Sequence, residues 1–386
     1  MHRRSRFARA ARLLSALSDT DLTALIDNGT PGPIGVGGAS SVFSIAGIRV
    51  FAKRIPLTNR ELNRPHSTAN LFDLPIHCQY GVGGPSFNAW RELAANQLIT
   101  TALTAPEARA TPRLSTSTTR SAGDLARSAP AISPATDAAE APAAPFDAAV
   151  GSSPAGLRDD AAGFPLLYHW RVLPGRPPTA DEHADVDAVV ALMGGSPAVR
   201  DRLAALADAS SSLVLFLEHV PYRLHDSLSD DPLDRAETVE RQLSAMVGLL
   251  RDLHLLHLDP HMGNLLADGE RIYLADFGLA TSARFDLSAA ERRFAERNAT
   301  HDAGYASMTL TDWLVTNVCG VPTPAHGGPV ARNAYVTRCA GGDIPADVPQ
   351  PVAGILARHA PTAARMNAFY WRLFGGEVTA EYPGAS

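Results

Sequence analysis

Two aspartates and an asparagine stand close together in the stretch HLDPHMGNLLADGERIYLADFGLA, from His257 to Ala280. Asp259 and Asn264 share a short polar run, and Asp276 follows after two apolar, strand-like segments. A metal ion that bridges phosphates needs hard oxygen ligands, which a carboxylate and an amide carbonyl provide. A second carboxylate within hydrogen-bonding reach of a hydroxyl can orient that hydroxyl and take its proton. These residue types therefore suit a site that holds a metal-bound phosphate beside an acceptor hydroxyl.

A glycine-rich stretch and a lysine lie far upstream of these residues. Gly35, Gly37 and Gly38 fall between strand-like residues, where missing side chains would let backbone N–H groups approach phosphates. Glycines in an ordinary hairpin turn explain the same pattern. Lys53, in VFAKRI on the next strand, would need an anion if it faces inward, and Glu92 on the following helix could supply one. The alternatives are a solvent-exposed lysine and a solvated glutamate.

The elements that must position these residues are strands first and helices later. Residues 33–55 alternate small and apolar side chains around a turn at Ala46-Gly47, which predicts an antiparallel hairpin. A helix is expected over 86–100, with Ser86 or Asn88 as its cap. The other expected elements are strands over 164–173 and 212–220, a long helix over 234–257, and helices in 309–320 and 351–361. This order predicts an α+β fold with a β-rich part followed by a helical part.

Two further segments differ in composition from the rest. Residues 101–162 are dominated by Ala, Ser, Thr and Pro, so we expect a disordered surface insertion whose hydroxyls are available for phosphorylation. Residues 1–30 carry five arginines near their start. For them the sequence favours a solvated basic helical extension over an anchor for a membrane surface or an acidic partner.

Composition narrows the class of protein. The chain has 386 residues, of which 45% are hydrophobic, so it can bury a real core. A net charge of -6 gives no overall attraction for nucleic acid, and no run of about 18 apolar residues predicts a transmembrane segment. Cys78, Cys319 and Cys339 are far apart, which implies no disulfide framework and fits a reducing cytoplasm.

Four motifs, taken in order, resemble those of the protein-kinase-like superfamily. GVGGASSVF is similar to its glycine-rich loop, VFAK to its strand lysine motif, HLDPHMGN to its catalytic loop and DFG to its metal-binding motif. The match covers roughly residues 33 to 320. The resemblance implies a bilobal kinase-like fold, with a small β-rich N-lobe that contains one helix in 31–220 and a larger helical C-lobe in 221–386.

The resemblance also implies a role for each motif residue. Asp259 would be the catalytic base, His261 would meet the transferred phosphoryl group, and Asn264 and Asp276 would hold Mg²⁺. Lys53 would contact the α and β phosphates of ATP and pair with Glu92. The residues implied for the nucleotide are Gly35, Gly37, Gly38, Ser40, Lys53, Glu92, and the backbone of Glu218 and Val220 in LEHV, which would receive adenine.

Several departures from the usual pattern affect the acceptor. His261 stands where ordinary Ser/Thr kinases carry a lysine, and no APE sequence follows DFG, so HLDPHMGN looks more like the loops of aminoglycoside, choline-type and atypical kinases. Ser40 replaces the third glycine. The leading hypothesis is an ATP-dependent kinase acting on a protein Ser/Thr hydroxyl. The alternatives are a small-molecule kinase of the aminoglycoside-phosphotransferase type and an ATP-binding pseudokinase scaffold.

Three assignments have competing explanations. Glu61 lies in a loop that is added before the helix relative to the family pattern, and it is a minor rival to Glu92 as the partner of Lys53. Asp312 resembles the buried aspartate that braces a kinase catalytic loop, but a helix N-cap explains it equally well. His254, His257 and His261 could suggest zinc, although we favour His257 packing beneath the catalytic loop because a fourth ligand is missing nearby.

Overall fold

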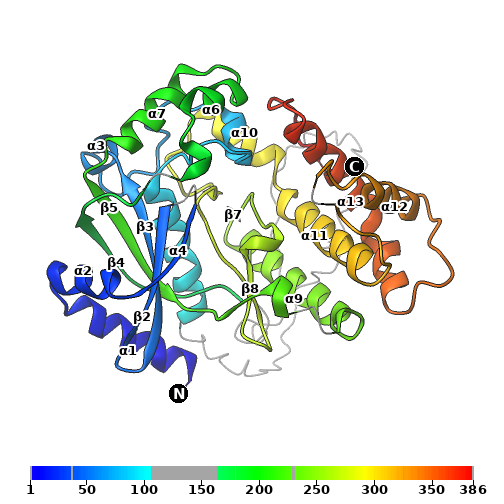
Figure 1. The fold of residues 1–386 in the computed structure, drawn as a ribbon, viewed down its shortest axis with the longest axis horizontal. Helices are drawn as coiled ribbons and strands as arrows, with labels where there is room; N and C mark the ends of the chain where they lie inside the picture. The colour runs from blue at the N-terminus through cyan, green and yellow to red at the C-terminus, as the bar shows by residue number, and fades with distance from the viewer. Residues whose placement is uncertain are drawn as a thin grey trace, which may run out of the picture.

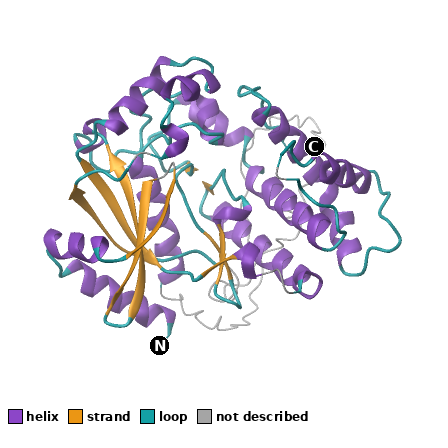
Figure 2. Cartoon of the chain, in the orientation of Figure 1, coloured by secondary structure: helices purple, strands orange, loops and turns teal. Residues whose placement is uncertain are grey.

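The computed structural model describes residues 2–35, 38–105, 163–178, 180–227, 231–324 and 326–384. Gly37 and most of the expected insertion, 106–162, lie outside these ranges. The described chain combines a five-stranded antiparallel sheet, two smaller sheets and many helices, so the predicted α+β class is confirmed (Figures 1 and 2).

The large sheet has the strand order β1-β2-β3-β5-β4. Its strands are β1 (Thr30–Gly35), β2 (Gly38–Ile45), β3 (Ile48–Leu57), β4 (Leu167–Pro174) and β5 (Ser211–Glu218). Each expected strand is therefore present, and every neighbouring pair is antiparallel.

The predicted hairpin is formed by β2 and β3. Ala46 and Gly47 make its two-residue turn with φ angles of 47° and 80°, as a type I′ turn requires. The register places Ser40 opposite Lys53. The hairpin therefore fixes the lysine relative to the glycine-bearing end of β2.

β5 is apolar on both faces because helices cover the sheet on both sides. Leu213 and Leu215 pack with Trp90 of α4 (Ala89–Thr104). Val214 and Phe216 belong instead to the main core cluster. Alternate residues of a strand point to opposite faces, so α4 covers one face and the N-terminal helices cover the other.

The N-terminal helices are α1 (Arg3–Ser15) and α2 (Asp19–Asp27). Ala10 and Leu14 of α1 are fully buried in the core that also holds Phe216. The predicted basic helix is present, but the prediction that it is a solvated extension is wrong. These two apolar residues lie one helical turn apart, which gives an arginine-rich helix a narrow face that packs against the sheet (Figure 1).

α4 begins at one of the predicted caps and ends later than predicted. Asn88 caps the helix by accepting a hydrogen bond of 2.9 Å from the Trp90 N–H. The helix continues to Thr104, so the expected disordered segment begins too early at 101. Leu103 lies one turn beyond Ile99 and is buried with it, which extends the apolar face past the change in composition.

The expectation of one helix beside the sheet is wrong. In addition to α1 and α2, the structure contains α3 (Asn59–Leu62), α6 (Val186–Leu192) and α7 (Pro197–Ala207). The short 3-10 helices η1 (Ile76–Tyr80) and η2 (Asp181–His183) accompany them. A separate apolar cluster joins α6 and α7 to the segment before α4 through Leu71, Phe72, Leu74, Cys78, Phe87, Val189, Val190, Met193, Val199 and Leu203.

The polar stretch from His257 to Ala280 contributes a small sheet that lies between the large sheet and the helices (Figure 1). The pair β8 (Leu265–Ala267) and β9 (Ile272–Leu274) confirms the predicted strand-loop-strand. β6 (Tyr222–Arg223) extends this sheet. The remaining short elements are α8 (Leu224–Ser227), η3 (Met262–Asn264), and the antiparallel pair β7 (Leu255–Leu256) and β10 (Thr281–Ser282).

The rest of the described chain is helical. Its helices are α9 (Pro232–Asp252), α10 (Ala289–Arg297), α11 (His301–Asn317), α12 (Val330–Ala340) and α13 (Val352–Phe374).

α9 confirms the long predicted helix but ends before 257. His254, with a φ of 51°, adopts the left-handed conformation that terminates helices. Among the described residues, no helix combines the length and apolarity needed to cross a membrane.

Candidate functional site

A cleft of about 380 Å³ lies where the large sheet meets the β8–β9 pair. β1, β2 and β3 form one wall, the end of β5 forms the rear, and the chain around η3 and Asp276 forms the opposite wall. Most of the residues predicted to bind a nucleotide or metal line it, namely Gly35, Gly38, Ser40, Lys53, Glu92, Glu218, Val220, Asn264 and Asp276. The fold thus brings together residues that lie more than 200 positions apart in the sequence.

Lys53 is at the centre of the cleft's charge arrangement. Its Nζ lies 2.7 Å from Glu92 Oε1 and 2.8 Å from Asp276 Oδ1, and only 8% of the residue is exposed. Burial alone would lower the pKa of Lys53, but the Asp276 and Glu92 carboxylates outweigh burial and raise it. The ammonium is therefore charged and contacts two carboxyl groups, and burial raises the pKa of one of them, Glu92, to about 7.

Glu92 is the helix partner of Lys53, and Glu61 is not. Glu61 Oε2 lies 2.9 Å from Arg202 Nη1, and both side chains are fully buried. Glu61 Oε1 also accepts a 2.8 Å hydrogen bond from the Ala89 N–H at the start of α4. Glu61 is thus a structural residue that fixes the start of the helix carrying Glu92.

Asp276 differs from Glu92 in its exposure to the cleft. Its side chain is 42% exposed, and its φ of 67° lies in the left-handed region, which is uncommon outside glycine. Burial pushes the pKa of Asp276 upward, but the neighbouring Lys53 ammonium outweighs burial and lowers it. Asp276 therefore presents an ionised carboxylate to the cleft.

Asp259 and Asn264 are joined by the amide of the asparagine. Asn264 Nδ2 donates to the Asp259 carbonyl at 2.9 Å and to Asp259 Oδ2 at 3.3 Å. Burial and then the negative charge of Asp276 raise the pKa of Asp259 to about 7. Asp259 can therefore accept a proton near neutral pH.

His261 lies beside the same carboxylate. Its Nε2 is 3.6 Å from Asp259 Oδ2, and 47% of the side chain is exposed. Its Nδ1 accepts a 2.9 Å hydrogen bond from the Gly263 N–H, so a neutral His261 carries its proton on Nε2. Burial lowers the pKa of His261.

His257 packs beneath this loop, as predicted. Its Nδ1 accepts a 3.2 Å hydrogen bond from the Asp259 N–H, so Nε2 carries the proton and donates to the Ala275 carbonyl at 3.0 Å. The buried ring lies 4.9 Å from that of Phe277. His257 therefore joins the backbone beside Asp259 to the backbone beside Asp276.

The alternative of a zinc site receives no support from the described residues. Nowhere among them do three or more His, Cys, Asp or Glu side chains gather as a metal would require. His254 instead lies at the end of α9, and Cys78, Cys319 and Cys339 are free.

The buried aspartate that supports the loop is Asp302, which the sequence analysis did not identify. Its two carboxylate oxygens accept hydrogen bonds of 2.7 Å from the His257 N–H and 2.9 Å from the Leu258 N–H. Leu258 has a φ of 68°, so the loop turns sharply where it is held. An acidic residue in the first turn of a helix, within HDAGYASM, was the only signal available in the sequence.

Both interpretations of Asp312 are wrong. The residue lies deep inside α11 rather than at its N-cap. Its carboxylate pairs with Arg332 of α12 at 2.9 Å and accepts a 2.9 Å hydrogen bond from Asn367 of α13. Asp312 therefore joins three helices instead of bracing the loop before η3.

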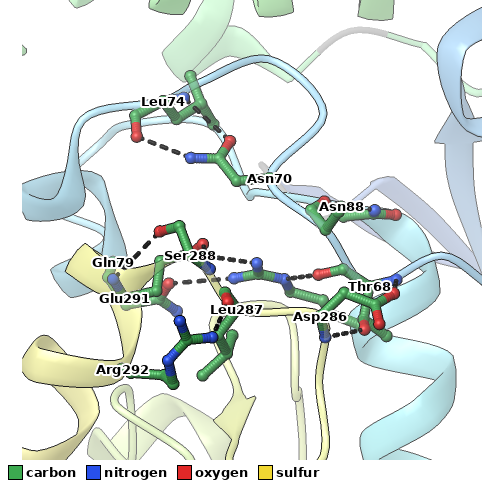
Figure 3. Close-up of polar contacts among 12 residues, drawn as sticks. Thr68, Asn70, Leu74, Gln79, Asn88, Asp286, Leu287, Ser288, Glu291 and Arg292 are labelled. Atoms are coloured by element: carbon green, nitrogen blue, oxygen red, sulfur yellow. Dashed lines mark hydrogen bonds and ion pairs between the residues drawn. The ribbon is translucent and has the colours of Figure 1, made fainter.

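The segment before α4 connects that helix to the chain after Asp276 (Figure 3). Arg91, next to Glu92 in α4, pairs with Glu291 of α10, and both side chains are buried. The Arg91 Nε also donates to the Thr68 carbonyl at 2.6 Å.

Thr68 and Asp286 extend this connection through two reciprocal hydrogen bonds. The Thr68 N–H donates to Asp286 Oδ2 at 3.2 Å, and the Asp286 N–H donates to Thr68 Oγ1 at 2.8 Å. Gln79 adds a third link by donating to the Leu279 carbonyl. We call residues 63–88 the strap, because they hold α4 against the segment that follows Asp276.

The two described glycines of the predicted phosphate loop differ in their surroundings. A Cβ on Gly38, whose φ is 116°, would lie 1.9 Å from the Arg54 carbonyl oxygen. Gly38 is therefore required by its close approach to β3. A Cβ on Gly35 would meet open space, and Gly37 is outside the described residues.

The cleft can thus supply a charged ammonium, an ionised carboxylate and an amide oxygen to a phosphate and its cation. Asp259 can take a proton from an acceptor. No protein-family model matches this sequence, and comparison with curated proteins likewise finds no match.

Proposed function

We propose that the protein is an ATP-dependent kinase with a bilobal kinase-like fold, which transfers the γ-phosphate of Mg-ATP to a hydroxyl. The observation that carries this proposal is the contact of Lys53 with both Glu92 and Asp276 inside the cleft. A buried ammonium at this position can bind phosphate oxygens while Glu92 on α4 fixes its direction. The cleft's position between a sheet and a helical part supports the same assignment.

The oxygen atoms of Asn264 and Asp276 suit Mg²⁺ as ligands. The Asn264 Nδ2 is occupied by Asp259, which leaves its carbonyl oxygen as the group available to a cation, and Asp276 adds an ionised carboxylate. Hard oxygen ligands of this kind, completed by phosphate oxygens, suit Mg²⁺. When bound there, the cation would neutralise phosphate charge.

The chain's own residues account for the remaining requirements. Lys53 would hold the phosphates, and the backbone around Glu218 and Val220 would receive the adenine base at the rear of the cleft. Asp259 would orient the acceptor hydroxyl and take its proton. His261, 3.6 Å from the same carboxylate, would lie beside the transferred group.

A protein Ser/Thr hydroxyl is the proposed acceptor, and a small molecule is the second candidate. The strap favours the second. Through Thr68 and Gln79 it covers part of the segment after Asp276, the region where an extended peptide would otherwise have free backbone to contact.

Transfer can be tested by incubating the full chain with Mg²⁺ and ATP labelled on its γ-phosphate. The proposal predicts label on a protein or an added hydroxyl compound, mapped by mass spectrometry. Label on protein Ser or Thr favours the first acceptor class, whereas turnover only with added small hydroxyl compounds favours the second. Absence of transfer to peptides, proteins and a panel of hydroxyl compounds would oppose kinase activity.

A further inference from the structure

The first turn of α1 reaches the end of β5, at the rear of the cleft. Arg3 Nη2 and Nε lie 2.6 and 2.9 Å from Glu218 Oε2, and Arg6 Nη2 lies 2.6 Å from Glu218 Oε1. Glu218 is only 5% exposed. Two guanidinium groups from one helix therefore hold a single buried carboxylate, with each carboxylate oxygen engaged.

Arg3 also joins this carboxylate to other parts of the chain. Its Nη2 donates to the Phe164 carbonyl, just before β4. Its guanidinium carbon lies 5.4 Å from the centre of the Tyr273 ring, on the strand that leads to Asp276. Arg3 thus connects α1 to the rear of the cleft and to the strand that leads to Asp276.

Glu218 itself lines the cleft together with His219 and Val220. Its N–H donates to the Leu166 carbonyl at 2.8 Å, so the residue is held by its backbone on one side and by its carboxylate on the other. A buried carboxylate that loses its cationic partners must move toward water or take up a proton. Either response would displace the chain that lines the rear of the cleft.

We propose that Arg3 and Arg6 are positioning residues of the nucleotide site, which hold Glu218 so that residues 218–220 present their backbone to the base. This inference rests on the proposed function. The phosphate-binding ammonium of Lys53 pairs instead with Glu92 and Asp276. The two arginines should therefore affect recognition of the base rather than of the phosphates.

The test is the full chain carrying Arg3→Gln and Arg6→Gln, with Arg9→Gln and Arg12→Gln as the matched control. Arg9 and Arg12 are exposed on the same helix, so the control removes equal charge. Calorimetry would give the Kd of Mg-ATP, and competition would give the inhibition constant of inorganic tripolyphosphate, a probe that lacks the base. Steady-state assays would give kcat and the KM for ATP.

We expect the Kd and the KM for ATP to rise by about 10-fold in the Arg3/Arg6 variant, as for loss of charge-assisted hydrogen bonds. The inhibition constant of tripolyphosphate and the value of kcat should stay within about twofold of those of the wild type. The Arg9/Arg12 control should match the wild type in every quantity. Unchanged affinity for Mg-ATP in the Arg3/Arg6 variant would overturn the inference. Equal weakening of Mg-ATP and tripolyphosphate would also overturn it, because it would show a general loosening of the fold.

Two further variants keep the test decisive if the double glutamine variant does not fold. Arg6→Gln alone removes the partner whose side chain is 39% exposed, and we expect about a threefold rise in the Kd of Mg-ATP. Arg3→Lys with Arg6→Lys retains the charges and should bind Mg-ATP more tightly than the glutamine variants do. A wild-type chain that fails to bind Mg-ATP would instead overturn the proposed function.

Discussion

Asp302, in the first turn of α11, accepts a 2.7 Å hydrogen bond from the backbone N–H of His257. Its other oxygen accepts the N–H of the next residue, Leu258. One buried carboxylate thus satisfies two consecutive backbone donors immediately before Asp259. The helical part of the molecule thereby sets the position of the loop that carries the proposed base.

Asp302→Ala should remove that support. It would leave two buried N–H groups without partners, so we expect a loss of about 2–5 kcal/mol in the free energy of unfolding, measured by urea denaturation. Asp302→Asn keeps one acceptor oxygen and should lose less. Equal stability of Asp302→Ala and the wild type would contradict a bracing role.

The Asp302 carboxylate also predicts how stability changes when the pH falls. Burial would raise the pKa of Asp302, but hydrogen bonding and the charge of His301 outweigh burial and lower it. An acid whose pKa is lowered on folding stabilises the fold above its unfolded pKa, about 3.9, and loses that contribution on acidification. Asp302→Asn should therefore show a weaker loss of stability at acid pH than the wild type.

The roles proposed for Asp259 and Asp276 can be separated by substitution. Asp276→Ala should weaken Mg-ATP binding and abolish turnover, because the cation and Lys53 lose a shared carboxylate. Asp259→Asn should retain nucleotide affinity while turnover falls by about 10²- to 10⁴-fold, the scale of a lost general base. Calorimetry paired with turnover assays gives both quantities. Full turnover in Asp259→Asn would remove the base assignment.

The raised pKa of Asp259, about 7, predicts a pH dependence. A base acts when it is deprotonated, so kcat/KM should increase as the pH rises through about 7. Lys53→Arg leaves Asp259 in place. Any residual activity of that variant should therefore show the same increase as the pH rises. A wild-type rate that is flat between pH 5.5 and pH 8.5, chosen as the assay range, would be inconsistent with this assignment.

The buried pair of Arg91 and Glu291 predicts a loss of stability when it is broken. Arg91→Met leaves the Glu291 carboxylate buried without its cation, which should cost about 3–5 kcal/mol in unfolding free energy. Replacing both residues, as Arg91→Met with Glu291→Leu, should recover much of that stability. Arg200→Gln is the control, since its partner Asp187 is 84% exposed, and it should unfold like the wild type.

The sequence predicted best those parts of the fold that depend on local patterns. The β2–β3 hairpin follows from alternation around Ala46 and Gly47, and α4 from its cap at Asn88. The polar loop that carries Asp259 was also identifiable, because its residue types are rare in combination.

Features that depend on distant contacts could not be predicted in this way. Asp302 and Asp312 are both acidic residues in one helix, and only tertiary packing decides which of them meets the backbone of His257. Arg3 and Arg6 looked like solvated charges because their partner, Glu218, lies more than 200 residues away. The sequence shows the strap only as an added loop, since its contacts with Leu279 and Asp286 leave no periodic pattern.

Calorimetric titration of Mg-ATP into the wild type and into Lys53→Met tests the central claim most directly. Methionine retains much of the lysine's length but carries no charge, so the variant removes the contacts of Nζ with Glu92 and Asp276. We predict saturable binding of one Mg-ATP to the wild type and at least about 10-fold weaker binding to Lys53→Met. A wild-type chain that binds no Mg-ATP, or a Lys53→Met chain that binds it equally well, would contradict the proposed nucleotide site.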